Sequence, residues 1–247
     1  MEDTGKPIIS VCGKGGVGKT ALCAMLARAL REEGVSPLLL IDADPAGGLV
    51  SAVGEKVGKT LAGARQAMIE SARKGDAKEK ERLARDLDYL VMEALVERDG
   101  YALLAMGRMD EKGCFCPANT LLREAIDLLV TPFAFVLIDA EAGLEQISRQ
   151  VTRRVTRVLA VTDGSSRGRD TVQHILNMVG AEKLAVAANR VPDESGLDLP
   201  PGVPLLGVVP EDPMVRDFDR AGRSLWELPS GNPALSAARK LARRLLA

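Results

Sequence analysis

Gly13-Lys14-Gly15-Gly16-Val17-Gly18-Lys19-Thr20 is the stretch that decides the fold of this chain. It matches G-x-x-x-x-G-K-[ST], the pattern of a phosphate-binding P-loop. The apolar residues 7–12 before it predict a buried strand, and residues 20–33 after it predict a helix with leucines on one face. Strand, glycine-rich turn and helix together are the context that this motif requires, so the sequence predicts a nucleotide site.

The residue types of this loop suit a phosphate ligand. Glycines let the backbone wrap around phosphate oxygens with its N–H groups pointing inward, and the helix N-terminus adds the positive end of its dipole. In the motif, Lys19 reaches the β- and γ-phosphates and Thr20 ligates Mg²⁺. The predicted nucleotide-binding residues here are Gly13, Lys14, Gly15, Gly16, Val17, Gly18, Lys19, Thr20 and Ala21.

Composition excludes several classes of protein. The chain has 247 residues, of which 46% are hydrophobic, and this length is near the upper limit for one core. A net charge of −1 provides no basic field for nucleic acid, and no apolar run approaches the length of a membrane span. Residues 1–6 lack the basic and apolar regions of a signal peptide. We therefore expect one cytoplasmic domain over residues 1–247, with neither nucleic acid nor membrane as a partner.

Apolar runs predict the rest of the fold. Further strands are expected at 37–41, 101–106, 133–139, 158–162, 183–188 and 203–209. Because these runs are apolar on both faces, they indicate an α/β fold with a doubly wound, mostly parallel sheet and helices on both faces. Residues 58–98 are charged and poor in glycine, which predicts a helical insertion of two helices broken near Gly75-Asp76. We expect this insertion to pack on the core of the domain. The alternative is that it forms a surface that binds a partner.

Lys14, the second lysine of the loop, is not needed by an ordinary P-loop. The form G-K-G-G-V-G-K-T resembles the deviant Walker A loop of the P-loop NTPases that include the MinD, ParA and nitrogenase iron-protein families. The resemblance implies an ATP-hydrolysing homodimer in which Lys14 reaches the partner's nucleotide, with Lys14 and Lys19 both catalytic.

The same resemblance gives roles to carboxylates that follow two predicted strands. It implies that Asp44 orients or deprotonates the attacking water, that Asp42 lies near the Mg²⁺ shell, and that Asp139 holds Mg²⁺ through water. From the residues alone, Asp42 and Asp44 could also be a polar turn after a strand. The remaining nucleotide contacts that the resemblance implies are Gly143 at the γ-phosphate and Asn189, Arg190 and Pro210 around the adenine ring.

Cys114 and Cys116 form a Cys-x-Cys pair just before a predicted helix over 118–130. A helix N-terminus favours the thiolate, which is the metal-binding form, and a disulfide over this spacing would be strained. Two thiolates supply two of the four ligands of a tetrahedral metal site. The same two cysteines of a second subunit would supply the other two in a two-fold dimer. Cys-x-Cys alone is a weak signal, however, and structural cysteines are the alternative. Cys12 and Cys23 lie on the first strand and helix, and we expect them in the core.

Longer sequence segments on both sides of the Cys-x-Cys pair resemble one group within this class of ATPases. Gly107-Arg108, then residues 113–123 (GCFCPANTLLR), then Asp139-Ala140-Glu141-Ala142-Gly143 resemble the CooC group, the nickel-maturation ATPases of carbon monoxide dehydrogenase. The resemblance extends from the P-loop to about residue 225. It implies that Cys114 and Cys116 of two subunits bind one nickel or zinc ion per dimer, and that the client is carbon monoxide dehydrogenase or the related acetyl-CoA synthase.

Two other readings stay open. A positioning ATPase like ParA or MinD would bind DNA or a membrane, using the arginines of a predicted helix over 147–157 or the C-terminal helix over 234–247, but it would leave Cys114 and Cys116 without a role. An electron-transfer protein like the nitrogenase iron protein would bridge two subunits with an iron–sulfur cluster. Its ligand cysteines lie far apart in sequence, whereas these are two residues apart.

Overall fold

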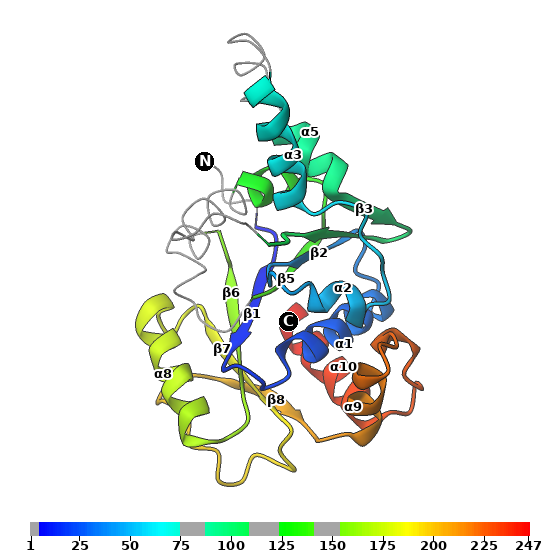
Figure 1. Cartoon of the computed structure of the whole chain (residues 1–247). Helices are drawn as coiled ribbons and strands as arrows, with labels where there is room; N and C mark the ends of the chain where they lie inside the picture. Colours follow the sequence, from blue (N-terminus) through cyan, green and yellow to red (C-terminus); the bar gives the residue numbers. More distant parts are fainter. Residues whose placement is uncertain (1–4, 75–86, 109–123, 141–153) are drawn as a thin grey trace.

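The structure, a computed structural model, describes residues 5–74, 87–108, 124–140 and 154–247. Eight strands are found in these residues: β1 (Ile8–Gly13), β2 (Leu38–Asp42), β3 (Leu95–Arg98), β4 (Tyr101–Ala105), β5 (Phe135–Asp139), β6 (Arg157–Thr162), β7 (Leu184–Asn189) and β8 (Leu205–Val209). They form one sheet in the order β3-β4-β2-β5-β1-β6-β7-β8 (Figure 1). Neighbouring strands run parallel except β3 and β4, so the predicted fold class is confirmed.

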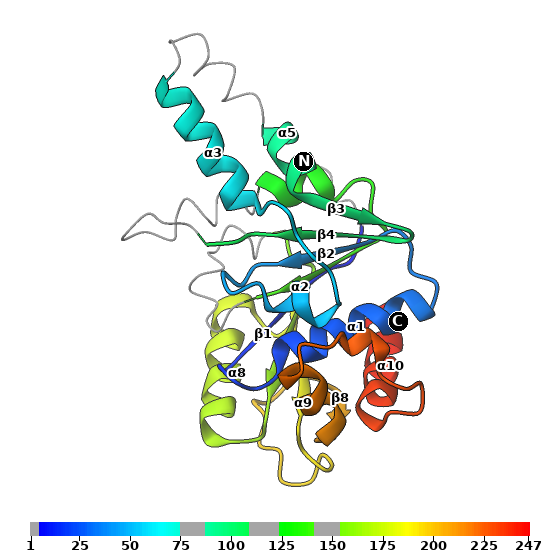
Figure 2. The same cartoon turned by 45° about the vertical axis from the view of Figure 1, so that its right-hand side comes forward.

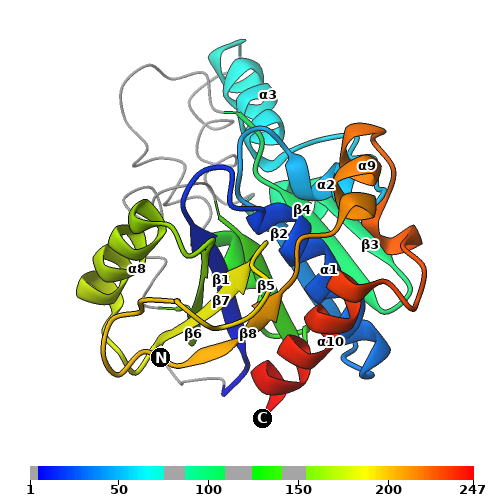
Figure 3. The same cartoon turned by 90° about the horizontal axis from the view of Figure 1, so that it is seen from below.

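Helices cover both faces of this sheet. They are α1 (Lys19–Glu32), α2 (Gly48–Ala52), α3 (Leu61–Lys74), α5 (Leu87–Ala94), α8 (Ser166–Val179), α9 (Pro213–Arg220) and α10 (Pro233–Leu246). Figure 2 shows α3 and α5 on the opposite side of the sheet from α1, α2 and α10, and Figure 3 shows α8 and α10 on opposite sides. Two hydrophobic cores result, one under α1 and α10 and one under α5 and α8.

Alternation along the central strand explains the two cores. Ile9 and Val11 of β1 point into the core under α1, whereas Ile8 and Cys12 point into the opposite core. Helices cover both faces of the sheet, so every residue of β1 is buried and most of them are apolar. Cys12 and Cys23 are wholly buried free thiols, as expected for core residues. Burial raises the pKa of Cys12 to about 12, although the nearby Lys19 ammonium opposes this.

The helical prediction for residues 58–98 was wrong at its C-terminal end. Residues 95–98 form β3, which pairs antiparallel with β4 through a two-residue turn at Asp99-Gly100. Asp-Gly is a common hairpin turn, because glycine readily adopts a positive φ, and Gly100 has a φ of 78° here. This pairing at the sheet edge overrides the helical tendency of the preceding residues. The predicted break at Gly75-Asp76 lies outside the described residues.

The predicted helix over 147–157 was also wrong where it can be compared. Residues 154–156 are not helical and Arg157 begins β6. The backbone N–H of Thr156 donates to the carbonyl of Ile8 at 2.9 Å, which aligns this segment beside β1. Val155, Thr156 and Val158 are β-branched and favour an extended backbone. Within the described residues, no helix is long and apolar enough to span a bilayer.

Candidate functional site

The P-loop crosses from the C-terminal end of β1 to the N-terminus of α1. Gly13 is the last residue of β1 and Lys19 is the first of α1, with Gly18 as the N-cap at φ 89°. In open α/β sheets this edge, at the carboxyl ends of the strands, is where ligands bind. Lys19 is only 9% exposed, and its Nζ donates to the Lys14 carbonyl at 3.2 Å across the loop. The strand, loop and helix predicted from the motif are therefore present.

Two buried carboxylates lie side by side at this edge. Asp42 ends β2 and Asp139 ends β5, and the two residues are direct partners in the parallel register. Asp42 is fully buried and accepts hydrogen bonds from the N–H groups of Asp44 at 3.2 Å and Val50 at 3.1 Å. Burial raises the pKa of Asp42 to about 6, although these backbone donors oppose the shift.

Asp139 is the less satisfied of the two carboxylates. It is 1% exposed, and within the described residues neither carboxylate oxygen has a well-aligned hydrogen-bond partner. Burial raises the pKa of Asp139 to about 7, although the neighbouring Thr20 hydroxyl favours the charged form. A buried oxygen without a partner is costly unless a cation or a proton compensates it. Oxygen donors from Asp139, Asp42 and Thr20 suit Mg²⁺, so these residues fit that ion.

Asp44 lies two residues beyond Asp42, in the turn after β2. Its Oδ1 accepts from the N–H of Ala46 at 2.8 Å, and its side chain is only partly buried. A short helix that the sequence did not predict, α2, follows this turn, and Gly48 at its start packs against the Thr20 side chain. The turn is thereby placed beside the N-terminus of α1, within the same edge of the sheet as the P-loop.

Lys14 has a partner in its own chain. Its Nζ lies 2.5 Å from Oδ2 of Asp163 and 3.0 Å from Oγ of Ser165. Asp163 follows β6, and Ser165 is the N-cap of α8, where its hydroxyl accepts from the N–H of Gly168. Partial burial raises the pKa of Asp163, but hydrogen bonds from Lys14 and Ser165 outweigh this and lower it to about 2. The sequence did not single out Asp163 or Ser165.

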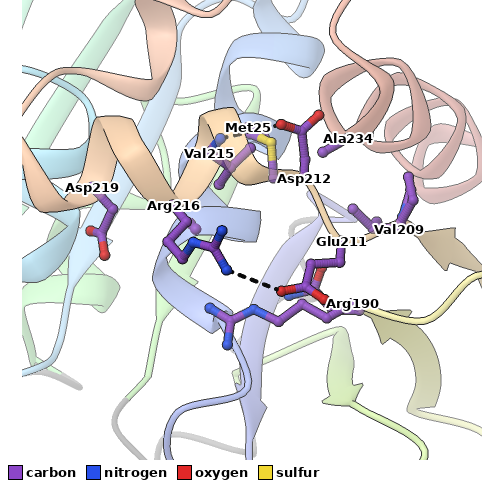
Figure 4. A pocket seen from close by; sticks show the side chains of 12 residues that line it. Met25, Arg190, Val209, Glu211, Asp212, Val215, Arg216, Asp219 and Ala234 are labelled. Carbon is purple, nitrogen blue, oxygen red and sulfur yellow. Dashed lines mark hydrogen bonds and ion pairs between the residues drawn. The ribbon is translucent and has the colours of Figure 1, made fainter.

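A cavity of about 240 Å³ opens beside the P-loop (Figure 4). It brings together four residues that were predicted to bind nucleotide: Ala21, Asn189, Arg190 and Pro210. Its other walls are Met25, Val209, Glu211, Asp212, Val215, Arg216, Asp219 and Ala234. The residues from α9 were missed. Asp212 followed by Pro213 is an N-cap and first-turn signal that could have located this helix.

Three predicted site residues, Cys114, Cys116 and Gly143, lie outside the described residues. The described segments nearest to them in sequence leave the sheet at the edge already described. After β4, the N–H of Met106 donates to the carbonyl of Asp42 at 2.9 Å. After β5, the N–H of Ala140 donates to the carbonyl of Val11 at 3.0 Å.

Sequence comparisons agree with this geometry. The family model for the CobQ/CobB/MinD/ParA nucleotide-binding domain matches residues 8–225. The chain is 35% identical to an uncharacterised ATP-binding protein of Methanocaldococcus jannaschii, over 97% of this chain and 98% of that protein. It is 33% identical to the carbon monoxide dehydrogenase accessory protein CooC of Rhodospirillum rubrum, over 89% of each chain.

Solved structures share the fold along almost the whole chain. The cell division ATPase MinD of Pyrococcus furiosus is 26% identical, with a TM-score of 0.71 over 98% of this chain and 99% of that one. A ParA family ATPase of Chlorobium tepidum also has a TM-score of 0.71, over 96% and 98% of the two chains, and its 16% identity shows the fold alone.

Proposed function

The chain belongs to the CobQ/CobB/MinD/ParA family of nucleotide-binding domains, and we propose that it is a dimeric metallochaperone that assists nickel insertion into a client enzyme. Family membership makes it a P-loop ATPase that hydrolyses ATP with Mg²⁺. The proposed client is carbon monoxide dehydrogenase or the related acetyl-CoA synthase, and the proposed location is the cytoplasm. The observation that carries the proposal is the similarity to CooC over 89% of both chains, together with the Cys-x-Cys pair inside it.

The proposed hydrolytic site uses the edge of the sheet that holds the P-loop. Thr20, Asp42 and Asp139 would hold Mg²⁺, directly or through water, and the ion would neutralise charge on phosphate oxygens. The Lys19 ammonium would neutralise further charge on the β- and γ-phosphates. Asp44 would orient the attacking water and accept its proton as the new oxygen–phosphorus bond forms and the bond to ADP breaks.

The proposal includes a homodimer that forms around ATP. ATPases of this family typically dimerise, and the loop resemblance implies that Lys14 would reach the partner's nucleotide. Lys14 would have to leave Asp163 to reach it, so the two arrangements exclude each other. Gly143 would contact the γ-phosphate in the ATP state and lose this contact on hydrolysis. Such a change could open and close the dimer interface.

The cargo site would lie between the two subunits. Cys114 and Cys116 from each of two chains supply four thiolates, which is the number that a tetrahedral soft-metal site requires. Two thiolates from one chain leave the shell half-filled. The proposed stoichiometry is therefore one nickel or zinc ion per dimer.

The alternative of a positioning ATPase has a weaker basis in the structure. The apolar face of α10 is buried in the core, where Leu235, Leu241 and Leu245 pack, so it does not offer the free apolar face of a membrane-binding helix. Arg154, one of the arginines considered for DNA, forms an ion pair with Asp127 at 2.8 Å. The family model ends at residue 225, and the packing of α10 on α1 beyond it supports one domain over residues 1–247.

Metal analysis of the purified protein tests the proposal. We expect one nickel or zinc ion per dimer, and with nickel a sulfur-to-metal charge-transfer absorption that zinc lacks. Cys114→Ser and Cys116→Ser should each abolish tight binding, because either change leaves two thiolates per dimer. A Cys12→Ala, Cys23→Ala variant, which keeps the pair and loses the buried thiols, should bind metal normally.

Two outcomes would contradict the metal site. One is a Cys114→Ser, Cys116→Ser double variant that keeps one tightly bound metal per dimer, since the ligands would then lie elsewhere. The other is metal that never co-purifies or binds at micromolar added nickel or zinc. ATP hydrolysis should continue in the cysteine variants, because the nucleotide pocket is built from other residues.

A further inference from the structure

We propose that Asn189 and Arg190 act as a brace that holds the phosphate loop in its binding conformation and links it to the base pocket. Both residues line the cavity beside the P-loop, where the family resemblance assigns them to the adenine ring. Their side chains, however, bond to backbone carbonyls of the loop itself. The inference concerns nucleotide binding and hydrolysis, and it does not depend on the proposed metal.

Asn189 makes the better-buried of the two contacts. Its Nδ2 donates to the carbonyl of Val17 at 2.8 Å, and the residue is 5% exposed. Asn189 is the last residue of β7, which lies between β6 and β8. Because β7 is hydrogen-bonded to a strand on each side, the backbone position of Asn189 is fixed. Its side chain can therefore fix the position of the P-loop.

Arg190 makes the second contact from an unusual backbone conformation. Its Nη1 donates to the carbonyl of Gly16 at 3.0 Å, while its N–H donates to the carbonyl of Val209 at 2.8 Å. Its φ of 62° is left-handed, and no other non-glycine residue in the described part of the chain has a positive φ. Such a conformation costs on the order of 1 kcal/mol and persists where surrounding contacts enforce it.

The two contacts set the direction of neighbouring N–H groups. A trans peptide is planar, so its carbonyl and the next N–H point in opposite directions. Because the Val17 carbonyl points to Asn189, the N–H of Gly18 points away from Asn189. Because the Gly16 carbonyl points to Arg190, the N–H of Val17 points into the loop, where it donates weakly to the Lys14 carbonyl at 3.4 Å. Inward N–H groups are what a phosphate-binding loop requires.

Packing at Gly18 shows how close the brace approaches. A Cβ atom at Gly18 would lie 2.6 Å from Nδ2 of Asn189 and 3.4 Å from Nη2 of Arg190. Only glycine fits this position, and its φ of 89° also favours glycine. Gly18 therefore packs closely against Asn189 and Arg190. A base that enters the cavity would contact these two side chains, which already bond to the P-loop.

A ligand without a base separates bracing from base recognition. Inorganic tripolyphosphate with Mg²⁺ can occupy the phosphate loop but not the base pocket. We expect Asn189→Ala and Arg190→Gly to weaken its binding at least about 10-fold and to lower kcat for ATP hydrolysis. Glycine at 190 removes the guanidinium and tolerates the positive φ, so it introduces no backbone strain.

Val215→Ala is the matched control, because Val215 lines the same cavity from α9. It should weaken ATP binding and leave tripolyphosphate binding unchanged within about two-fold. Circular dichroism melting would confirm that each variant is folded. If Asn189→Ala fails to fold, Arg190→Gly carries the test, since Arg190 is exposed at the surface.

The proposal is overturned if Asn189→Ala and Arg190→Gly bind tripolyphosphate as the wild type does and lose only affinity for ATP, since they would then contact the base alone. Hydrogen exchange gives an independent measurement. The amide of Val17, which donates to the Lys14 carbonyl, should exchange faster in both variants relative to amides of the sheet core, and unchanged exchange there would also contradict the brace.

Discussion

Lys14 is bound to Asp163 within its own chain, with 2.5 Å between Nζ and Oδ2. The Ser165 hydroxyl, at 3.0 Å, completes the contact at the N-terminus of α8. The lysine that is proposed to act on a partner's nucleotide is therefore held in its own subunit. Dimerisation around ATP would have to replace this contact, so the strength of the contact should affect how readily the dimer forms.

Asp163→Asn should make ATP-dependent dimers form at lower protein concentration. The ion pair is partly exposed, and such pairs contribute about 1 kcal/mol or less, which corresponds to a shift of about two- to five-fold. Sedimentation with ATP in an Asp44→Ala background, in which hydrolysis should be slow, would measure it. Asp193→Asn is the control, because Asp193 makes the same turn with Ser195 at the surface. Equal dimerisation of Asp163→Asn and the control would show that the contact does not restrain Lys14.

Asp44→Ala should separate ATP binding from hydrolysis. Asp44 is proposed to position the water, and its Oδ1 caps the turn at Ala46. We expect binding of ATP within about three-fold of wild type and a fall in kcat of about 100-fold or more. Lys19→Ala, by contrast, should lose nucleotide binding itself. Fluorescent-nucleotide titration and phosphate release measure the two effects, and normal turnover by Asp44→Ala would remove Asp44 from the reaction.

Asp139 should make the nucleotide-free protein less stable as the pH rises. Its pKa is raised to about 7 in the fold, mainly by burial, against about 4 in the unfolded chain. Folding therefore favours the protonated form. This contribution to stability is fully present below about pH 4 and is lost as the pH rises through about 7. Asp42, with a pKa raised to about 6, acts in the same direction.

The Asp139→Asn variant tests this titration. In the presence of a chelator, its free energy of unfolding should fall less than that of wild type between about pH 5 and 8, by on the order of 2–4 kcal/mol. Urea unfolding at several pH values gives the comparison, and Mg²⁺ added at about pH 8 should stabilise the wild type but not the variant. Parallel pH curves for the two proteins would show that Asp139 does not titrate in this range.

The C-terminal helix should be part of the core. Leu241 of α10 is 1% exposed and packs against Gly207 of β8, whereas Leu246 of the same helix is 43% exposed. Leu241→Ala should cost about 2–5 kcal/mol, and Leu246→Ala about 0.5 kcal/mol or less. Urea unfolding would measure both. If the two substitutions cost the same, α10 is not docked as the structure places it, and membrane binding by this helix would regain support.

Some of the site follows from short stretches of sequence. The P-loop was predictable because its strand, glycine turn and helix are consecutive, so local propensity and spacing suffice. Asp42 and Asp139 were predictable as neighbours of the loop because each ends an apolar strand, and the carboxyl ends of parallel strands meet at one edge. β3 was missed although its Asp99-Gly100 turn is also local, since residues 95–98 were read as the end of the second of two predicted helices.

By itself, then, the sequence determined the nucleotide site, the parallel sheet and the resemblance that motivates the metal proposal, because each depends on residues close together along the chain. Only the tertiary structure decided which side chains hold the P-loop residues. Lys14 meets Asp163 across 149 residues, and Asn189 meets Val17 across 172. These contacts depend on the strand order β1-β6-β7, which brings the ends of three strands to one edge. Strand order is set by packing of the whole sheet and its helices, so no local pattern encodes it.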